Sequence, residues 1–151
     1  MIGPEVPESL KHGHEILCSE LKNIVALGSE IGAKAQLLDK IMSAHFKREE
    51  EYALPPLGLL LALADGNWDL DSTEAIKMSE ILKSKLSELK KEHDNISEAL
   101  ENLKKVALQK NNLSVNRFVK DLTQHVDIED QVLYPATILV GNYLKQMKKG
   151  N

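Results

Sequence analysis

The chain contains the same arrangement of histidine, glutamate and proline twice, and this repeat limits the folds that it can adopt. Each copy has a lone histidine, followed further along the chain by a His-x-x-x-Glu segment and a proline. The copies are His14, His45, Glu49 and Pro55, and then His93, His125, Glu129 and Pro135. The lone histidines are 79 residues apart, and each of the other three pairs is 80 residues apart. Such constant offsets are rarely a product of chance and indicate two copies of one structural unit.

The apolar residues around the two lone histidines repeat as well, at helical spacing. They are Leu10, Leu17, Leu21 and Ile24 around His14, and Leu89, Ile96, Leu100 and Leu103 around His93. Both histidines are therefore predicted on the core-facing stripes of amphipathic helices. In each His-x-x-x-Glu segment, a helix would place the imidazole and the carboxylate on one face. Buried polar groups need partners that offset their desolvation, and a metal ion would supply one.

Helical spacing continues through most of the sequence, and the β-branched runs typical of strands are missing. We predict an all-α, up-down-up-down four-helix bundle with kinked second and fourth helices. The first helix is expected from Pro7 or Glu8 to about Glu30, the second from Gly32 or Ala33 to Pro55-Pro56, the third from a cap at Asp71 or Ser72 to a break at Gln109–Asn112, and the fourth after that break. Pro55-Pro56 should kink or end the second helix, and Pro135 should kink the fourth.

Two details of this prediction concern how the helices face the core. The fourth helix is expected to carry the following residues on its inner side: Phe118, Leu122, His125, Glu129, Val132 and Leu133. The apolar segment 57–64 is expected to form a short helix before a turn at residues 65–67. It would either close the core or form a dimer contact, so the chain is predicted to be a monomer or a homodimer.

Size and composition favour one soluble domain over residues 1–151, since 42% of the residues are hydrophobic and 28% are charged. The formal net charge of −4, without a large Lys/Arg cluster, argues against nucleic-acid binding. The longest apolar run is shorter than the ~20 residues of a membrane-spanning helix, and the N-terminus lacks the basic start and apolar stretch of a secretory signal. With Cys18 as the only cysteine, a reducing cytoplasm is the expected location.

Six residues are candidate metal ligands: His14, His45, Glu49, His93, His125 and Glu129. Imidazoles and carboxylates suit iron, manganese or zinc, and the absence of thiolate ligands disfavours an iron-sulfur cluster. If both glutamates bridge two ions, each ion receives two imidazole nitrogens and two carboxylate oxygens. A shared oxo or hydroxo group would be a fifth ligand and leave one open position, where dioxygen, nitric oxide, peroxide or water could bind.

The sequence resembles the hemerythrin-like (HHE cation-binding) family of non-haem di-iron proteins, over almost the whole chain. The residues that carry this resemblance are Gly-His-Glu-Ile at His14, His-Phe-Lys-Arg-Glu-Glu-Glu from His45, Glu-His-Asp-Asn-Ile at His93, and His-Val-Asp-Ile-Glu-Asp-Gln-Val-Leu-Tyr-Pro from His125. The resemblance implies a carboxylate-bridged centre of two iron ions in a four-helix bundle. It is the resemblance that selects iron.

The ligand pattern differs from that of the oxygen-carrying hemerythrins, which have a His-x-x-x-His pair on the third helix and five histidine ligands. Here Leu89 and Ser97 flank His93, so that second histidine is missing. The four-histidine, two-glutamate pattern is more similar to the di-iron domain of iron-sulfur repair proteins, although their cysteine-containing N-terminal domain is absent here. Reversible oxygen carriage is therefore not inferred from the resemblance.

The leading functional hypothesis is a di-iron protein that binds, senses or detoxifies dioxygen, nitric oxide or peroxide. The alternative is iron storage or delivery, including iron donation in iron-sulfur cluster repair. A ferritin-like oxidase is disfavoured because no histidine has a glutamate three residues before it, and a zinc hydrolase because His-Glu-x-x-His is absent. A metal-free interaction bundle would leave the six polar residues in core stripes without a common explanation.

Residues next to the candidate ligands have simpler expected roles. His12 would lie about 200° around the helix from His14, so we expect it to be exposed or to contact a ligand from outside. Glu50 and Asp130 could orient a ligand, although most acidic neighbours should be solvated. Cys18 is expected to be a small buried hydrophobe. Tyr52 and Tyr134 are expected mainly to pack, with a hydrogen bond to the site as the alternative.

Overall fold

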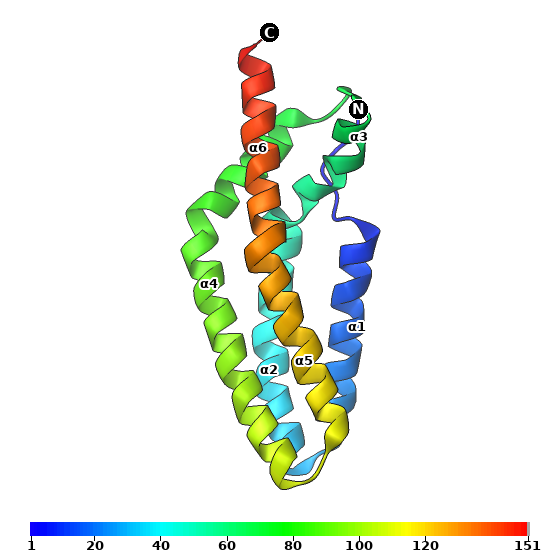
Figure 1. Ribbon diagram of the computed structural model, residues 1–151, viewed down its shortest axis with the longest axis vertical. Coiled ribbons are helices and arrows are strands. Elements are labelled where there is room, and N and C mark those ends of the chain that lie inside the picture. The colour runs from blue at the N-terminus through cyan, green and yellow to red at the C-terminus, as the bar shows by residue number, and fades with distance from the viewer. Residues whose placement is uncertain (151) are drawn as a thin grey trace.

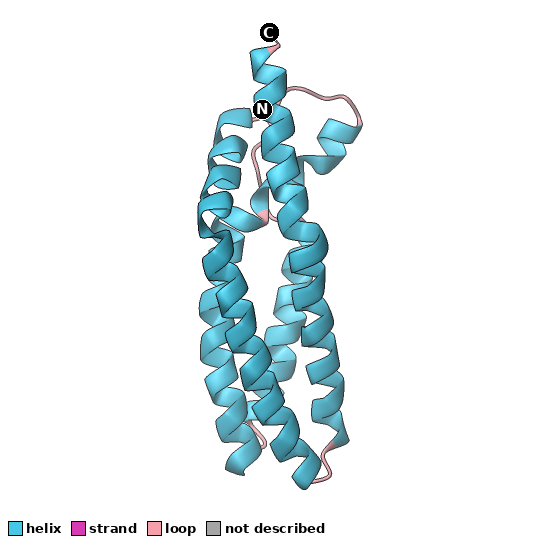
Figure 2. Cartoon of the chain, turned by 60° about the vertical axis from the view of Figure 1, so that its left-hand side comes forward, coloured by secondary structure: helices cyan, strands magenta, loops and turns pink. Residues whose placement is uncertain are grey.

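The computed structural model describes residues 1–150, and over this range the chain forms an up-down-up-down helical bundle (Figure 1). The helices are α1 (Glu8–Val25), α2 (Ser29–Arg48), α3 (Leu60–Ala64), α4 (Ser72–Gln109), α5 (Leu113–Ile128) and α6 (Tyr134–Lys149). The fourth long helix consists of α5 and α6, joined by one π-helical turn. Short loops connect the helices at one end, and a longer connection that includes α3 joins α2 to α4 at the end with both termini (Figure 2). The predicted fold class is confirmed. None of the helices described is long and apolar enough to cross a membrane.

The boundary between the first two helices was predicted wrongly. Helix α1 ends at Val25 rather than near Glu30, and α2 already begins at Ser29. Gly28 and Ser29 have positive φ angles, of 68° and 49°, so the chain leaves the helical conformation there and reverses. Gly32 lies inside α2, where an added Cβ would come within 2.7 Å of the Val25 carbonyl oxygen. This glycine permits close contact between the helices and does not begin a helix.

The long helix α4 follows the sequence prediction closely. Its N-cap is Asp71, whose Oδ1 accepts a hydrogen bond of 3.1 Å from the backbone N–H of Glu74. The predicted stripe includes these buried residues: Leu82, Leu89, His93, Ile96, Leu100 and Leu103. At the predicted break after Gln109, the chain turns, and Asn112 caps α5 through a 3.2 Å hydrogen bond from the Ser114 N–H.

A π-helical turn follows directly after each His-x-x-x segment, and helical periodicity did not reveal it. The two turns are Glu49–Ala53 and Glu129–Leu133, so each begins at a candidate glutamate ligand. Each contains one more residue per turn than an α-helix, which rotates the following residues by about 100°. Val132 was predicted to face inward but is 55% exposed for this reason. After the first π turn the chain continues through a 3-10 helix at Pro55–Leu59.

The apolar core is divided along the bundle. One cluster lies toward the α1–α2 and α4–α5 turns and includes Leu21, Leu38 and Leu103. Two smaller clusters lie toward the other end and include Leu82, Tyr134 and other residues of α4 and α6. On α4, Leu89 belongs to one end and Ile96 to the other, so His93 marks a polar layer between the two apolar regions.

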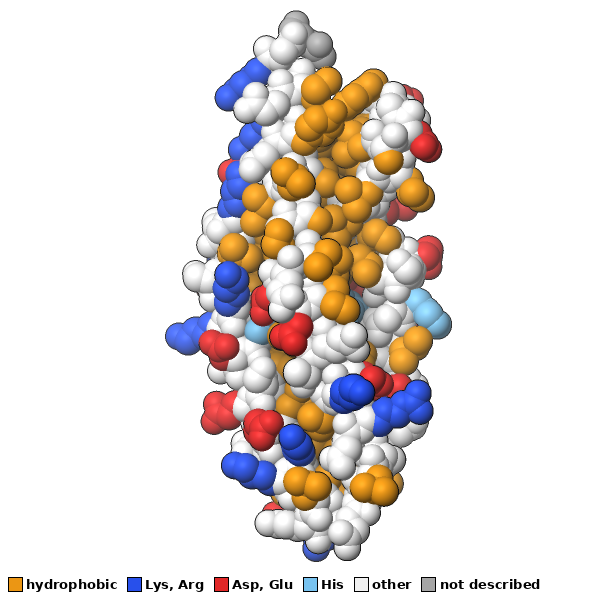
Figure 3. Space-filling model, viewed as in Figure 1, with side chains coloured by type: hydrophobic (Ala, Val, Ile, Leu, Met, Phe, Trp, Pro, Cys, Tyr) orange, Lys and Arg blue, Asp and Glu red, His pale blue; other side chains and the backbone are white. Residues whose placement is uncertain are grey.

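The predicted short apolar segment lies at the end of the bundle that contains both termini (Figure 1). Leu57 and Leu59 are buried and close the core, whereas Leu60 and Leu61 are exposed. Hydrophobic side chains gather over this half of the visible face, and charged side chains are more frequent over the other half (Figure 3). Closure of the core is thus one role of the segment, and the oligomeric state stays a prediction.

Helices α4 and α6 approach each other closely at Gly141, and this contact gives a stability prediction. A Cβ added to Gly141 would lie 2.0 Å from the Oγ and 2.3 Å from the Cβ of Ser79, which is fully buried. We expect Gly141→Ala to lower the free energy of unfolding by roughly 1–3 kcal/mol through overpacking. Urea denaturation would measure the change.

Gly13→Ala is a matched control, because Gly13 is helical and an added Cβ there meets no atom within 4 Å. This change should be neutral or stabilise by up to about 1 kcal/mol through helix propensity. Equal effects at the two glycines would contradict the packing explanation.

Candidate metal centre

The structure brings all six candidate ligands into the polar layer of the core. His14 comes from α1, His45 from α2, His93 from α4 and His125 from α5, while Glu49 and Glu129 begin the two π turns. Five of the six are buried, and His125 is partly buried. They form two overlapping groups that could each hold a metal ion, with ligand atoms within 4.8 Å of one another. The groups are His14, Glu49, His125 and Glu129, and His45, Glu49, His93 and Glu129.

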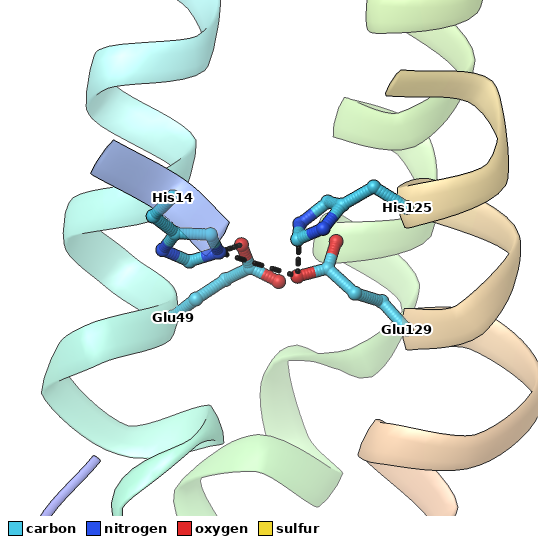
Figure 4. Close-up of side chains that lie close together, drawn as sticks. All are labelled: His14, Glu49, His125 and Glu129. Carbon is cyan, nitrogen blue, oxygen red and sulfur yellow. Dashed lines mark ion pairs between the residues drawn. The ribbon is translucent and has the colours of Figure 1, made fainter. Parts of the chain in front are cut away.

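In the first group, the two imidazoles approach the carboxylates from different helices (Figure 4). His14 Nε2 lies 3.5 Å from Glu49 Oε1 and 3.7 Å from Glu129 Oε2. His125 Nε2 lies 3.2 Å from the same Glu129 oxygen. The nitrogen atoms therefore converge on the space between the two carboxylates.

The second group repeats this arrangement on the other side of the same carboxylates. His45 Nε2 is 3.4 Å from Glu49 Oε1, and His93 Nε2 is 3.2 Å from Glu129 Oε1. The two Nε2 atoms are 3.0 Å apart. Because both glutamates belong to both groups, their positions suit carboxylates shared between two cations.

The polar atoms of this layer fit a metal centre better than a closed hydrogen-bond network. These buried atoms have no hydrogen-bond partner: both ring nitrogens of His14, Oε1 of Glu49, Nε2 of His125 and both carboxylate oxygens of Glu129. A buried polar group without a partner costs roughly 1–3 kcal/mol, so unpartnered groups rarely gather in a folded core. Nitrogen and oxygen donors in this arrangement match the borderline ligands of iron, manganese or zinc.

Two outer carboxylates hold the imidazoles of the second group. His45 Nδ1 lies 2.8 Å from Glu92 Oε1, and His93 Nδ1 lies 2.9 Å from Asp130 Oδ1. Arg48 binds both oxygens of Glu92, with its Nε 3.1 Å from Oε1 and its Nη2 2.5 Å from Oε2. Donation of the Nδ1 proton to a carboxylate leaves the Nε2 lone pair directed into the site and raises its basicity.

The sequence predicted a possible orienting role for Asp130 but missed Glu92 and Arg48. Glu92 precedes His93 on α4 and reaches across to His45 on α2, so only the packing of the helices reveals the contact. Glu50 lies 3.7 Å from His14 Nδ1, beyond hydrogen-bond distance. His12 is exposed, as predicted.

Tyr134 contacts the site through its hydroxyl group. The hydroxyl donates a 2.6 Å hydrogen bond to Glu49 Oε2 and lies 3.2 Å from His93 Nε2. Burial, together with the nearby Glu49 and Glu129 carboxylates, strongly raises the pKa of Tyr134, so the phenol keeps its proton. Packing was the main role expected for both tyrosines. Tyr134 instead makes a hydrogen bond to the site, while Tyr52 packs in the apolar core.

The pKa values of the two central carboxylates are shifted in opposite directions. Burial and the adjacent Glu129 raise the pKa of Glu49 well above its usual value. Burial acts in the same direction on Glu129, but the adjoining Glu49 and the surrounding imidazoles outweigh it and hold the pKa of Glu129 well below the usual value. Burial disfavours the charged form of His93, yet Glu129 and Asp130 outweigh it and raise its pKa. The raised pKa values of Glu49 and His93 favour their protonated forms, and a bound cation would displace those protons.

The Tyr134 hydrogen bond gives a second stability prediction. Tyr134→Phe should lower the free energy of unfolding by roughly 1–3 kcal/mol, because a buried Glu49 oxygen loses its donor. Denaturation in urea with a chelator present would measure it. Tyr52→Phe is the control, since Tyr52 packs in the same apolar cluster and its hydroxyl makes no side-chain hydrogen bond within residues 1–150. A loss of equal size in both variants would contradict the prediction.

Comparison with known proteins gives one match. The family model described as Hemerythrin HHE cation binding domain matches residues 6–137, a range that contains all six candidate ligands. Among curated proteins and among solved structures, none matches the chain.

Proposed function

Because the chain belongs to the hemerythrin HHE cation-binding domain family, we propose that it holds two iron ions and binds, senses or detoxifies dioxygen, nitric oxide or peroxide. The observation that carries this proposal is the set of nitrogen and oxygen atoms that converge from the four long helices, and six of these atoms are buried without a hydrogen-bond partner. One ion would be held by His14 and His125 and the other by His45 and His93, with Glu49 and Glu129 shared. Iron at these positions would supply redox chemistry and open coordination positions for a small ligand.

The surrounding residues orient the ligands and limit access of water. Phe46 stacks on the His14 ring with centroids 3.8 Å apart and parallel planes, which fixes the ring orientation. The Tyr134 hydroxyl fixes Glu49 and keeps a proton beside the site. Apolar clusters flank the polar layer along the bundle, so electrostatic interactions between its buried groups are strong. A site buried in this way is more accessible to diatomic molecules and peroxide than to larger substrates.

The proposal also includes the domain boundaries and the cellular compartment of the protein. We treat residues 1–151 as a single domain, because α6 continues beyond the matched range and packs on α4 along its length (Figure 1). A reducing, cytoplasmic location suits a chain in which Cys18 has no second cysteine to pair with.

The decisive experiment is anaerobic reconstitution with ferrous iron, followed by a count of bound metal and by visible absorption spectra as air is admitted and removed. Two iron ions per chain with reversible bands would support binding or sensing of a gas. Two ions that oxidise irreversibly would support peroxide or nitric oxide chemistry. Rapid loss of the iron to a mild chelator would favour the alternative of iron storage or delivery. Failure to take up iron would overturn the proposal.

A further inference from the structure

The two imidazole pairs differ in how the rest of the chain holds them. His45 and His93 each direct Nδ1 at a carboxylate within hydrogen-bond distance, 2.8 Å to Glu92 and 2.9 Å to Asp130. For His14, in contrast, the carboxylate near Nδ1 is 3.7 Å away, and neither ring nitrogen has a hydrogen-bond partner. The imidazoles of His45 and His93 are therefore supported by a carboxylate, and the imidazole of His14 is not.

The ligand group with the outer carboxylates is also the more deeply buried of the two. All four residues of the His45 and His93 group are buried, whereas the side chain of His125 is 18% exposed. Stacking on Phe46 fixes the plane of the His14 ring but supplies no acceptor for its proton. A carboxylate on Nδ1 fixes the tautomer and raises the basicity of Nε2, and its loss typically costs metal sites 10–100-fold in affinity.

A surface cavity leads to the less supported side. Its volume is about 430 Å³, and His14 lines it together with three glutamates, Glu15, Glu50 and Glu51, and one lysine, Lys47. The three glutamates are exposed, and the two ring nitrogens of His14 are buried and unpartnered. The carboxylates outnumber the single lysine, and net negative charge raises the local concentration of cations, so this cavity suits passage of a metal ion.

Next to the supported side, the described residues line a less acidic cavity of about 330 Å³. This cavity reaches Asp130 and Tyr134 but includes none of the six candidate ligands. Its other lining is mainly apolar and includes Lys90, whose positive charge balances the single carboxylate of Asp130.

We propose that the two metal positions are unequal: the position of His45 and His93 loads first and retains its ion, and the position of His14 and His125 exchanges its ion with solvent beside His14. This inference rests on the proposed function, since it presupposes that both groups bind metal. It assigns to Glu92, Arg48 and Asp130 a positioning role at the retained metal, exerted through the imidazoles of His45 and His93.

Cobalt(II) titration of the chelator-treated protein tests this inference, with the visible bands of the metal as the readout. Two binding steps separated by at least about 10-fold in affinity are expected, and a competing chelator should remove the metal in a fast and a slow phase. His125→Ala should abolish the weaker step and the fast phase and leave the tighter step. Its side chain is partly exposed, so the variant should fold, as circular dichroism would verify.

Variants of the outer carboxylates test the positioning role. Glu92→Ala and Asp130→Ala should weaken the tighter step by about 10- to 100-fold and leave the weaker step unchanged. Glu92→Gln keeps an acceptor oxygen without the charge, so an intermediate loss is expected. Asp94→Ala is the matched control, because this exposed carboxylate also adjoins His93 on α4, outside the six candidate ligands and the cavity beside His14, and its removal should change neither affinity.

The outcomes separate failure of the inference from failure of the proposed function. Absence of cobalt binding would overturn both. Two steps of equal affinity, loss of the tighter step in His125→Ala, or equal weakening of both steps by the Glu92 and Asp130 variants would overturn the inequality while the metal centre stands.

Discussion

Replacing Glu129 by alanine is expected to abolish metal binding at both positions. The Glu129 carboxylate lies near all four imidazoles, at 3.2 Å from the Nε2 atoms of His93 and His125, 3.7 Å from that of His14 and 3.8 Å from that of His45. Loss of an outer hydrogen-bond partner costs about 10- to 100-fold in metal affinity, so loss of a ligand shared by both ions should cost more than 100-fold.

Metal content after desalting measures this effect, with circular dichroism to verify the fold. The control is Asp127→Ala, which removes an exposed carboxylate two residues earlier on α5 and should keep the wild-type metal content. Glu49→Ala should behave like Glu129→Ala, because Glu49 also belongs to both groups. Retention of two metal ions in both glutamate variants would contradict the shared-ligand assignment.

The repeated spacing was sufficient to predict the fold class and which six residues would meet. Helical periodicity places a histidine and a glutamate four residues later on one face, and the constant offsets align the two copies. His93 shows why this works, since the stripe from Leu89 to Leu103 that contains it is buried as predicted. Metal ligation by these residues remains a proposal, which the variants above test.

Features that depend on local backbone strain or on contacts between helices were not predictable in this way. The π turn at Glu129–Leu133 changes the register by one residue, which a count of apolar positions cannot detect, and so Val132 faces solvent. The reversal at Gly28 and Ser29 requires positive φ angles within an otherwise helical pattern. Glu92 meets His45 only because α4 packs on α2, and no short-range signal in the sequence encodes that pairing.

Removal of metal is expected to lower the free energy of unfolding by about 5 kcal/mol, relative to protein in which free metal is 100 times the dissociation constant at each position. Ligand that binds only the folded state contributes about 2.7 kcal/mol per site under these conditions. The midpoint of urea denaturation with metal and with excess chelator measures the difference. Glu129→Ala should show no difference between the two conditions, and an equal metal effect in that variant would indicate binding elsewhere on the chain.

The loss of stability should be concentrated in the polar layer, because the apolar regions on either side of it do not depend on the ion. Leu21, Leu38 and Leu103 are fully buried away from the six candidate ligands, so their packing should persist when the metal is removed. Around Glu49 and Glu129, the unpartnered carboxylates and imidazoles would again bear the cost of burial. Amide hydrogen exchange should therefore speed up first at the two π turns and at α1 around His14, while amides of α2 and α4 near the α1–α2 turn stay protected. Uniform loss of protection along the bundle would show that the metal stabilises the fold only as a whole.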